Sequence, residues 1–92
     1  MDLINLREQI DEIDAALVPL FLKRMQISAK VADYKKSKGL PIYIPERENE
    51  ILEQVKSSVD SEYAESICAL YSAIFEISRA FQMKQNSEST ED

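Results

Sequence analysis

Three cationic side chains, those of Arg7, Arg24 and Lys35, lie on a stretch of sequence whose apolar pattern is that of one long amphipathic helix. Apolar residues recur at heptad-like spacing from Leu3 to Tyr34, and Arg24 stands where this series calls for a core residue. A guanidinium on such an apolar seam is costly unless an anion meets it. Lys35 follows eleven residues later on the same face. The pattern therefore predicts that these two cations bracket a small anion.

The composition narrows the chemistry that these residues can support. The chain has 92 residues and a net charge of −6, which argues against a nucleic acid partner because phosphate binding favours a basic surface. It has no histidine, which excludes a Ser-His-Asp arrangement, a Cys-His pair and a histidine-ligated metal. Its single cysteine, Cys68, is interpreted as a small core residue. No metal site is expected.

The sequence carries no sign of a membrane or secretory segment. Its first residues, MDLINLREQIDEID, are charged from the second position and lack the apolar run of a signal peptide. No apolar stretch approaches the ~20 residues that span a bilayer. We therefore expect a cytoplasmic protein without a membrane partner.

The periodicity predicts an all-α domain with three helices in the order long, short, long. The first spans residues 3 to about 38, and Gly39 suits the left-handed position just past its end. The apolar pattern continues in phase across Pro19, which is expected to kink this helix rather than end it. Residues 39–45, GLPIYIP, form the only clear loop.

Two further helices follow that loop. Pro45 suits the first turn of a short helix, which fades near Ser57. Asp60 is a good N-cap for the third helix. The apolar stripe of that helix consists of Ile67, Leu70, Tyr71, Ile74, Ile77 and Phe81. The polar, acidic residues 86–92 are expected to form a disordered tail after a domain of residues 1–85.

The first helix is too long for the other two to cover. Its 36 residues would span roughly 54 Å, and the exposed part of its seam predicts a second copy of the same helix around a two-fold axis. Arg7 and Arg24 would be about 25 Å apart along one helix, so they cannot grip one small ligand within a single chain. An antiparallel partner would bring its own Arg7 beside Arg24 and Lys35. We therefore predict an intertwined helical homodimer with sites shared between its chains.

Four segments together resemble the all-helical class of chorismate mutases. They are LREQIDEID, KRMQISAKVADYK, PERENEIL and EISRAFQ. They cover most of residues 3–82 in the right order and at compatible spacing. The resemblance implies the same intertwined homodimer, and it implies the rearrangement of chorismate to prephenate for the synthesis of phenylalanine and tyrosine.

That rearrangement is intramolecular and requires no nucleophile, metal, cofactor or proton shuttle. An enzyme has to hold the enolpyruvyl side chain over the ring in the reactive conformer and stabilise the charge that appears on the ether oxygen. The absence of histidine is therefore no obstacle, and no cofactor is expected.

The resemblance assigns the charge-binding and ether-oxygen roles to four residues. Arg24 and the partner's Arg7 would clamp the two carboxylates of chorismate with guanidinium forks. Lys35 and Gln82 would donate hydrogen bonds to the ether oxygen. Without the resemblance, Arg7 is more simply a solvated helix-face charge, and Lys35 complements the helix dipole.

The resemblance also assigns supporting roles. Glu48 would accept a hydrogen bond from the ring hydroxyl, while Arg47 and Ser78 would support the hydroxyl and carboxylate ends. On the residues alone, Arg47 and Glu48 can equally form a surface pair, and Ser78 can bond a neighbouring helix. The chain departs from the family pattern at Ile44, where relatives commonly carry Asp, and this puts the capping of the short helix in doubt.

Two other functions fit the same pattern. An isochorismate-pyruvate lyase would use a similar pocket and an equally helical dimer. A non-catalytic helical dimer that regulates a partner enzyme is the second, although it leaves Arg24 on the seam unexplained. Docking onto another enzyme of the pathway is also left open by the sequence.

Overall fold

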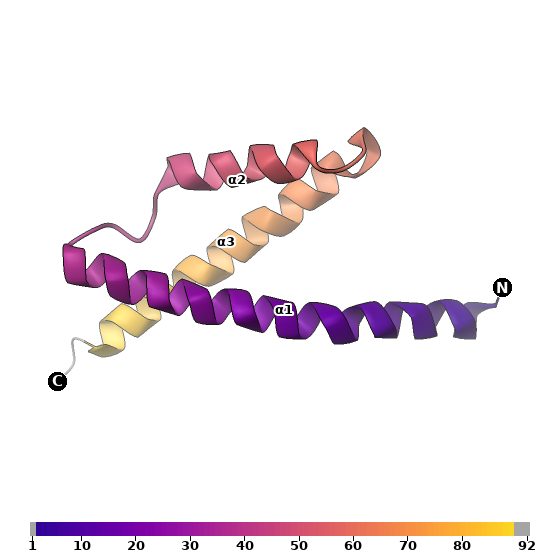
Figure 1. The fold of residues 1–92 in the computed structure, drawn as a ribbon, viewed down its shortest axis with the longest axis horizontal. Coiled ribbons are helices and arrows are strands. Elements are labelled where there is room, and N and C mark those ends of the chain that lie inside the picture. The colour runs from indigo at the N-terminus through magenta and orange to yellow at the C-terminus, as the bar shows by residue number, and fades with distance from the viewer. Residues whose placement is uncertain (1, 90–92) are drawn as a thin grey trace.

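The computed structural model describes residues 2–89 and consists of three α-helices (Figure 1). They are α1 (Leu3–Lys38), α2 (Pro45–Ser57) and α3 (Ser61–Ser89). The described residues contain no strand. The all-α class and the order long, short, long are therefore confirmed.

The third helix holds the other two together. α3 packs against both α2 and α1, whereas α1 and α2 do not pack against each other. Figure 1 shows α3 crossing the C-terminal half of α1 obliquely, while the N-terminal half of α1 projects beyond the other helices. Within residues 2–89, none of the three helices is long and apolar enough to cross a membrane.

Both ends of α1 are set by local chemistry. The Asp2 carboxylate caps the start by accepting a hydrogen bond from the backbone N–H of Asn5 at 2.8 Å, a cap that the sequence analysis missed. Gly39 ends the helix at φ +67°, as predicted. The helix also passes through Pro19 without ending, because the apolar pattern keeps its phase on both sides.

The helices α2 and α3 start at the positions that the sequence predicts. Pro45 is the first residue of α2, and Ile44 before it offers no side-chain cap to the helix. α3 begins directly after Asp60, whose backbone carbonyl accepts from the N–H of Tyr63 at 2.9 Å. Both boundaries therefore come from residues with restricted or turn-forming backbones, as the sequence analysis expected.

The end of α3 differs from the expected boundary at Gln85. The helix continues to Ser89, so residues 86–89 of the expected disordered tail are helical, and residues 90–92 lie outside the described part. The Gln85 amide donates to the backbone carbonyl of Ala29 at 3.2 Å and to the Asp33 carboxylate at 2.7 Å. These bonds tie the end of α3 to α1 and hold the last turns in place.

The single chain has little core of its own. Ala32 and Phe75 are the only apolar residues buried in the part of the chain that is described. Large apolar side chains of the N-terminal half of α1 are 40–70% exposed, namely Leu3, Ile4, Leu6, Ile10, Ile13, Leu17, Val18 and Leu20. Such a contiguous apolar face is typical of an interaction surface.

A substitution at Gly39 tests the left-handed cap. A Cβ at this position would meet no atom within 4 Å, so the cost of Gly39→Ala comes from the backbone alone. We expect Gly39→Ala to lower the free energy of unfolding by about 1 kcal/mol, and Gly39→Asn to lower it less because asparagine tolerates this conformation. Urea unfolding at equal protein concentration measures both, and equal stability of Gly39→Ala and the parent would contradict the assignment.

Candidate active site

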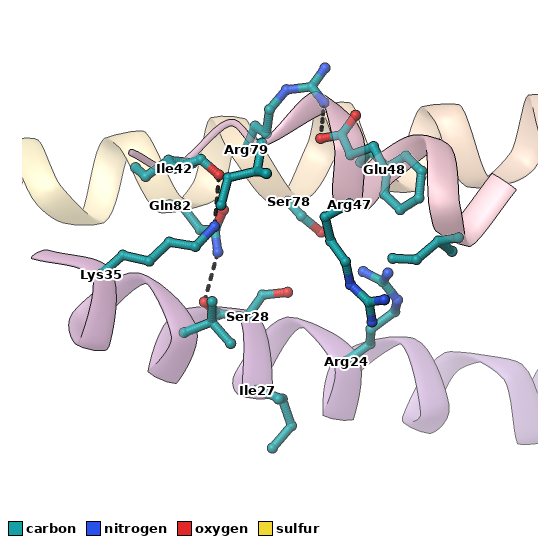
Figure 2. A pocket seen from close by; sticks show the side chains of 14 residues that line it. Arg24, Ile27, Ser28, Lys35, Ile42, Arg47, Glu48, Ser78, Arg79 and Gln82 are labelled. Atoms are coloured by element: carbon teal, nitrogen blue, oxygen red, sulfur yellow. Dashed lines mark hydrogen bonds and ion pairs between the residues drawn. The ribbon is translucent and has the colours of Figure 1, made fainter. Parts of the chain in front are cut away.

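A pocket of about 340 Å³ lies between the C-terminal half of α1, the N-terminal half of α2 and the C-terminal half of α3 (Figure 2). The loop of residues 39–44 contributes to its wall. Six of the seven residues predicted from the sequence line it, namely Arg24, Lys35, Arg47, Glu48, Ser78 and Gln82. Three helices far apart in sequence therefore bring the predicted set together.

Arg7 is the one predicted site residue that does not line the pocket of its own chain. It lies in the exposed N-terminal half of α1, seventeen residues before Arg24 on the same continuous helix. The rigid spacing along α1 therefore keeps the two guanidiniums apart, as the sequence analysis expected.

Arg24 enters the pocket from α1 against an aromatic wall. Its guanidinium carbon lies 5.8 Å from the ring centroid of Phe75 and 5.9 Å from that of Tyr71, within the range of cation–π contact. No carboxylate among the described residues pairs with it. Figure 2 shows Arg24 and Arg47 reaching from opposite helices toward the same end of the pocket. Two guanidiniums converging in this way favour an anion between them.

Lys35 and Gln82 lie at the other end of the pocket (Figure 2). The Lys35 ammonium donates to the backbone carbonyl of Ile42 at 2.9 Å, which links α1 to the loop. The Gln82 amide donates to the backbone carbonyl of Ser28 at 2.8 Å, and Gln82 is only 7% exposed. An ammonium has three N–H donors and a primary amide has two, so each side chain keeps a donor for a ligand.

Ser78 lies on α3 one turn before Gln82 and is equally buried, at 7% exposure. Its hydroxyl donates to the sulfur of Met25 at 3.7 Å, which is a weak acceptor. A buried hydroxyl held only by a thioether can readily turn to a better acceptor, such as a ligand carboxylate.

One interpretation of the sequence was a surface pair between Arg47 and Glu48, but these two neighbours do not pair with each other. Glu48 accepts a hydrogen bond from Arg79 of α3, whereas Arg47 pairs with Glu50 at 3.2 Å across exposed side chains. The guanidinium of Arg79 also lies 4.7 Å from the ring centroid of Tyr43. The hydrogen bond to Glu48 raises the pKa of Arg79 above its ordinary value.

Arg79 and Ser28 also line the pocket, and neither was predicted from the sequence. Arg79 stands in the segment EISRAFQ, three residues before Gln82, and this helical spacing places both on one face of α3. That spacing was the available signal. For Ser28 the pocket uses the backbone carbonyl, which no sequence pattern distinguishes.

The pocket lining has a net positive charge, whereas the whole chain has a net negative charge. The lining includes four cationic side chains and one carboxylate, whereas the chain has a net charge of −6. Ion pairing with Arg79 already offsets the carboxylate of Glu48. The remaining cations suit a small ligand with more than one negative charge, which the overall field of the protein would otherwise repel.

A comparison with protein families assigns the chain to one of them. The profile of the family described as chorismate mutase type II matches residues 6–83. This chain belongs to that family. The resemblance drawn from the four sequence segments is thereby confirmed, and the matched range includes all seven predicted site residues.

Relatives share about half of the chain. The T-protein of Enterobacter agglomerans is 49% identical over 51 residues, which are 55% of this chain and 14% of that protein. The chorismate mutase of Methanocaldococcus jannaschii is 37% identical over 54 residues, 59% of this chain and 54% of that protein. A bifunctional chorismate mutase/prephenate dehydratase of Aquifex aeolicus is 37% identical over 54 residues, 59% of this chain and 15% of that protein. The chain thus spans about half or less of the length of these relatives.

The unpaired state of Arg24 leads to a prediction about stability. Arg24→Met removes a charge without a carboxylate partner from an apolar wall, so we expect the free energy of unfolding to stay equal or to rise by up to about 1 kcal/mol. Arg79→Met is the matched control, since it breaks an ion pair and should lower stability by about 1 kcal/mol. Urea unfolding at equal protein concentration compares them, and a loss in Arg24→Met as large as in Arg79→Met would refute the prediction.

Proposed function

We propose that the protein is a chorismate mutase, which converts chorismate to prephenate in the synthesis of aromatic amino acids. The observation that carries this proposal is the convergence of six predicted polar residues from three helices on one cation-rich pocket, in a chain of this family. Chorismate has two carboxylates, and the charge of the pocket suits such a dianion.

Binding and orientation are assigned to the arginine end of the pocket. Arg24 takes one carboxylate of chorismate, and the partner subunit's Arg7 takes the other. Arg47 and Ser78 support the bound molecule at its hydroxyl and carboxylate ends. Fixing both carboxylates holds the enolpyruvyl group over the ring, and such restraint can remove several kcal/mol of the barrier, up to about 7–11 kcal/mol in favourable cases.

Charge stabilisation is assigned to the opposite end. Lys35 and Gln82 donate their free N–H groups to the ether oxygen. Its bond to the ring carbon breaks while the methylene carbon of the enolpyruvyl group bonds to the ring carbon that carries the carboxylate. Their bonds to Ile42 and Ser28 fix both side chains before the substrate arrives, which is the condition for effective electrostatic stabilisation. Glu48 accepts a hydrogen bond from the ring hydroxyl. A millionfold acceleration requires about 8 kcal/mol, which this set can supply without a metal or cofactor.

A second copy of the chain completes the site in this proposal. The exposed apolar face on the N-terminal half of α1 supports pairing with the same face of another copy. Antiparallel pairing brings the partner subunit's Arg7 toward the pocket, which Arg7 of the same chain cannot reach.

One relative is named as both a chorismate mutase and a prephenate dehydratase, and docking of this chain onto a second enzyme of the pathway stays a prediction. A cytoplasmic location stays one as well.

Direct assay of the purified chain tests the proposal. Chorismate should disappear at a rate proportional to protein concentration, and prephenate should be the product identified by mass and by its acid-catalysed conversion to phenylpyruvate. Isochorismate is the parallel substrate, and release of pyruvate from it without turnover of chorismate would assign the site to a lyase instead. Turnover of neither would leave the regulatory dimer as the better description.

Mixing two inactive variants tests the shared site. Arg7→Ala and Arg24→Ala should each lose at least about 100-fold in kcat/KM, because each removes one carboxylate contact from every site. After unfolding and refolding together, about half of the dimers are mixed and each has one intact site, so roughly a quarter of the parent activity should return. Recovery of none, with mixed dimers demonstrated by mass after nitrogen-15 labelling of one of the two variants, would place both arginines in the same chain's site or neither in it.

Gln82 gives a prediction with a direction in pH. Gln82→Glu places a carboxyl group where a donor is required, and only the protonated acid can donate to the ether oxygen. The group is buried against the carbonyl oxygen of Ser28, which also favours the protonated form. Turnover of Gln82→Glu should therefore be low near pH 8 and rise as the pH falls, while that of the parent changes much less. Profiles of the same shape for both proteins would remove Gln82 from the ether-oxygen role.

A further inference from the structure

The ion pair of Arg79 and Glu48 separates two hollows. The pocket described above lies on one side, and a second hollow of about 310 Å³ lies on the other, with Glu48, Phe75 and Arg79 lining both. The side chains of the pair are only 25% and 22% exposed. Because space is open on both sides, packing alone does not hold the Glu48 carboxylate in one orientation.

Three elements meet at this pair. Glu48 comes from α2, Arg79 from α3, and Tyr43 from the loop before α2. Arg79 contacts one oxygen of Glu48, Oε2, and lies 4.7 Å from the centroid of the Tyr43 ring (Figure 2 shows the ion pair). A planar guanidinium held by a carboxylate and an aromatic face has little freedom to turn. Arg79 does not bond the second oxygen of Glu48, Oε1, which can accept a further hydrogen bond.

The charge of Glu48 is a problem for a site that binds a dianion. It is the single carboxylate among the lining residues, and a bare anion there would repel the ligand that the other side chains attract. Arg79 offsets that charge at Oε2 without covering Oε1. The neighbouring Arg47 offers no substitute, because its guanidinium pairs with Glu50 and not with Glu48.

We propose that Arg79 is a positioning residue of the site, which offsets the charge of Glu48 toward an incoming dianion and orients its free oxygen, with Tyr43 as its support. This inference rests on the proposed function and adds to it a role for two residues that the reaction itself does not touch. Arg79 acts through Glu48 both when it offsets the charge and when it orients the free oxygen. Its effect on the substrate should therefore depend on a carboxylate at position 48.

A double-mutant cycle tests this dependence. The proteins are the parent, Arg79→Gln, Glu48→Gln and the double variant, and kcat and KM for chorismate are measured for each. Arg79→Gln should raise KM at least about fivefold in the parent background, the size of effect typical of coupled contacts. In the Glu48→Gln background the same change should alter KM less than about twofold, because no charge is left to offset.

Matched variants separate positioning from general charge and from packing. Lys84→Gln removes one cation from an exposed position of the same helix and should leave KM within about twofold. Arg79→Lys keeps the charge but loses the planar fork, so its KM should stay near the parent value while kcat falls. Tyr43→Phe should match the parent, whereas Tyr43→Leu should raise KM about two- to fivefold.

The outcomes are distinct. An active parent in which Arg79→Gln raises KM by the same factor in both backgrounds would show a structural role only and would overturn the inference. So would a rise in KM for Lys84→Gln as large as for Arg79→Gln. A parent that converts no chorismate would overturn the proposed function, and with it the role assigned here. Loss of the Arg79 effect in the Glu48→Gln background supports the inference.

Discussion

The side-chain hydrogen bonds of α3 to its two neighbours hold this chain in shape. With so few apolar residues buried in a single copy, the crossing of α1 and α3 depends on Gln82 bonding Ser28 and Gln85 bonding Asp33. The packing of α2 on α3 is fixed at the pocket by Arg79 and Glu48. Hydrogen bonds and ion pairs are directional, so they set the relative positions of the helices more narrowly than a small apolar contact would. Four of these residues also line the pocket, namely Ser28, Glu48, Arg79 and Gln82.

The use of charged side chains to line the pocket lowers the stability of the fold. The pocket lining has four cations and one carboxylate, so the cations repel one another until an anion binds. Arg24 adds to this cost, because no carboxylate among the described residues pairs with it. Aromatic faces moderate the cost, since the electron-rich face of a ring attracts a guanidinium without neutralising it. The charge of Arg24 thus stays available to a ligand. Sites of this kind commonly exchange folding free energy for function.

The sequence predicted those features that depend on residue type and helical period. Arg24 stood out because it interrupts an apolar seam, and it lines the pocket of the structure. Gly39 stood out because a left-handed residue suits the end of a helix, and it has that conformation just after α1. Arg79 was missed because its partner lies on another helix, and the crossing angle that joins them has no signature along the chain. Arg47 and Glu48 were ambiguous because adjacent residues on a helix point in different directions, so each found a different partner. The bonds of Gln85 to Ala29 and Asp33 of α1 were likewise not predicted, because they join residues more than fifty positions apart in the sequence.

The contact of Lys35 with the carbonyl of Ile42 has a consequence for recognition. A lysine side chain normally loses up to about 2 kcal/mol of rotamer entropy when it is fixed. Here the loop carbonyl has already fixed the ammonium before any ligand binds. A ligand oxygen that joins or replaces Ile42 as acceptor therefore meets an ordered donor and takes little entropy from it. The loop of residues 39–44 therefore orders the Lys35 ammonium in advance and so contributes to the affinity of the site.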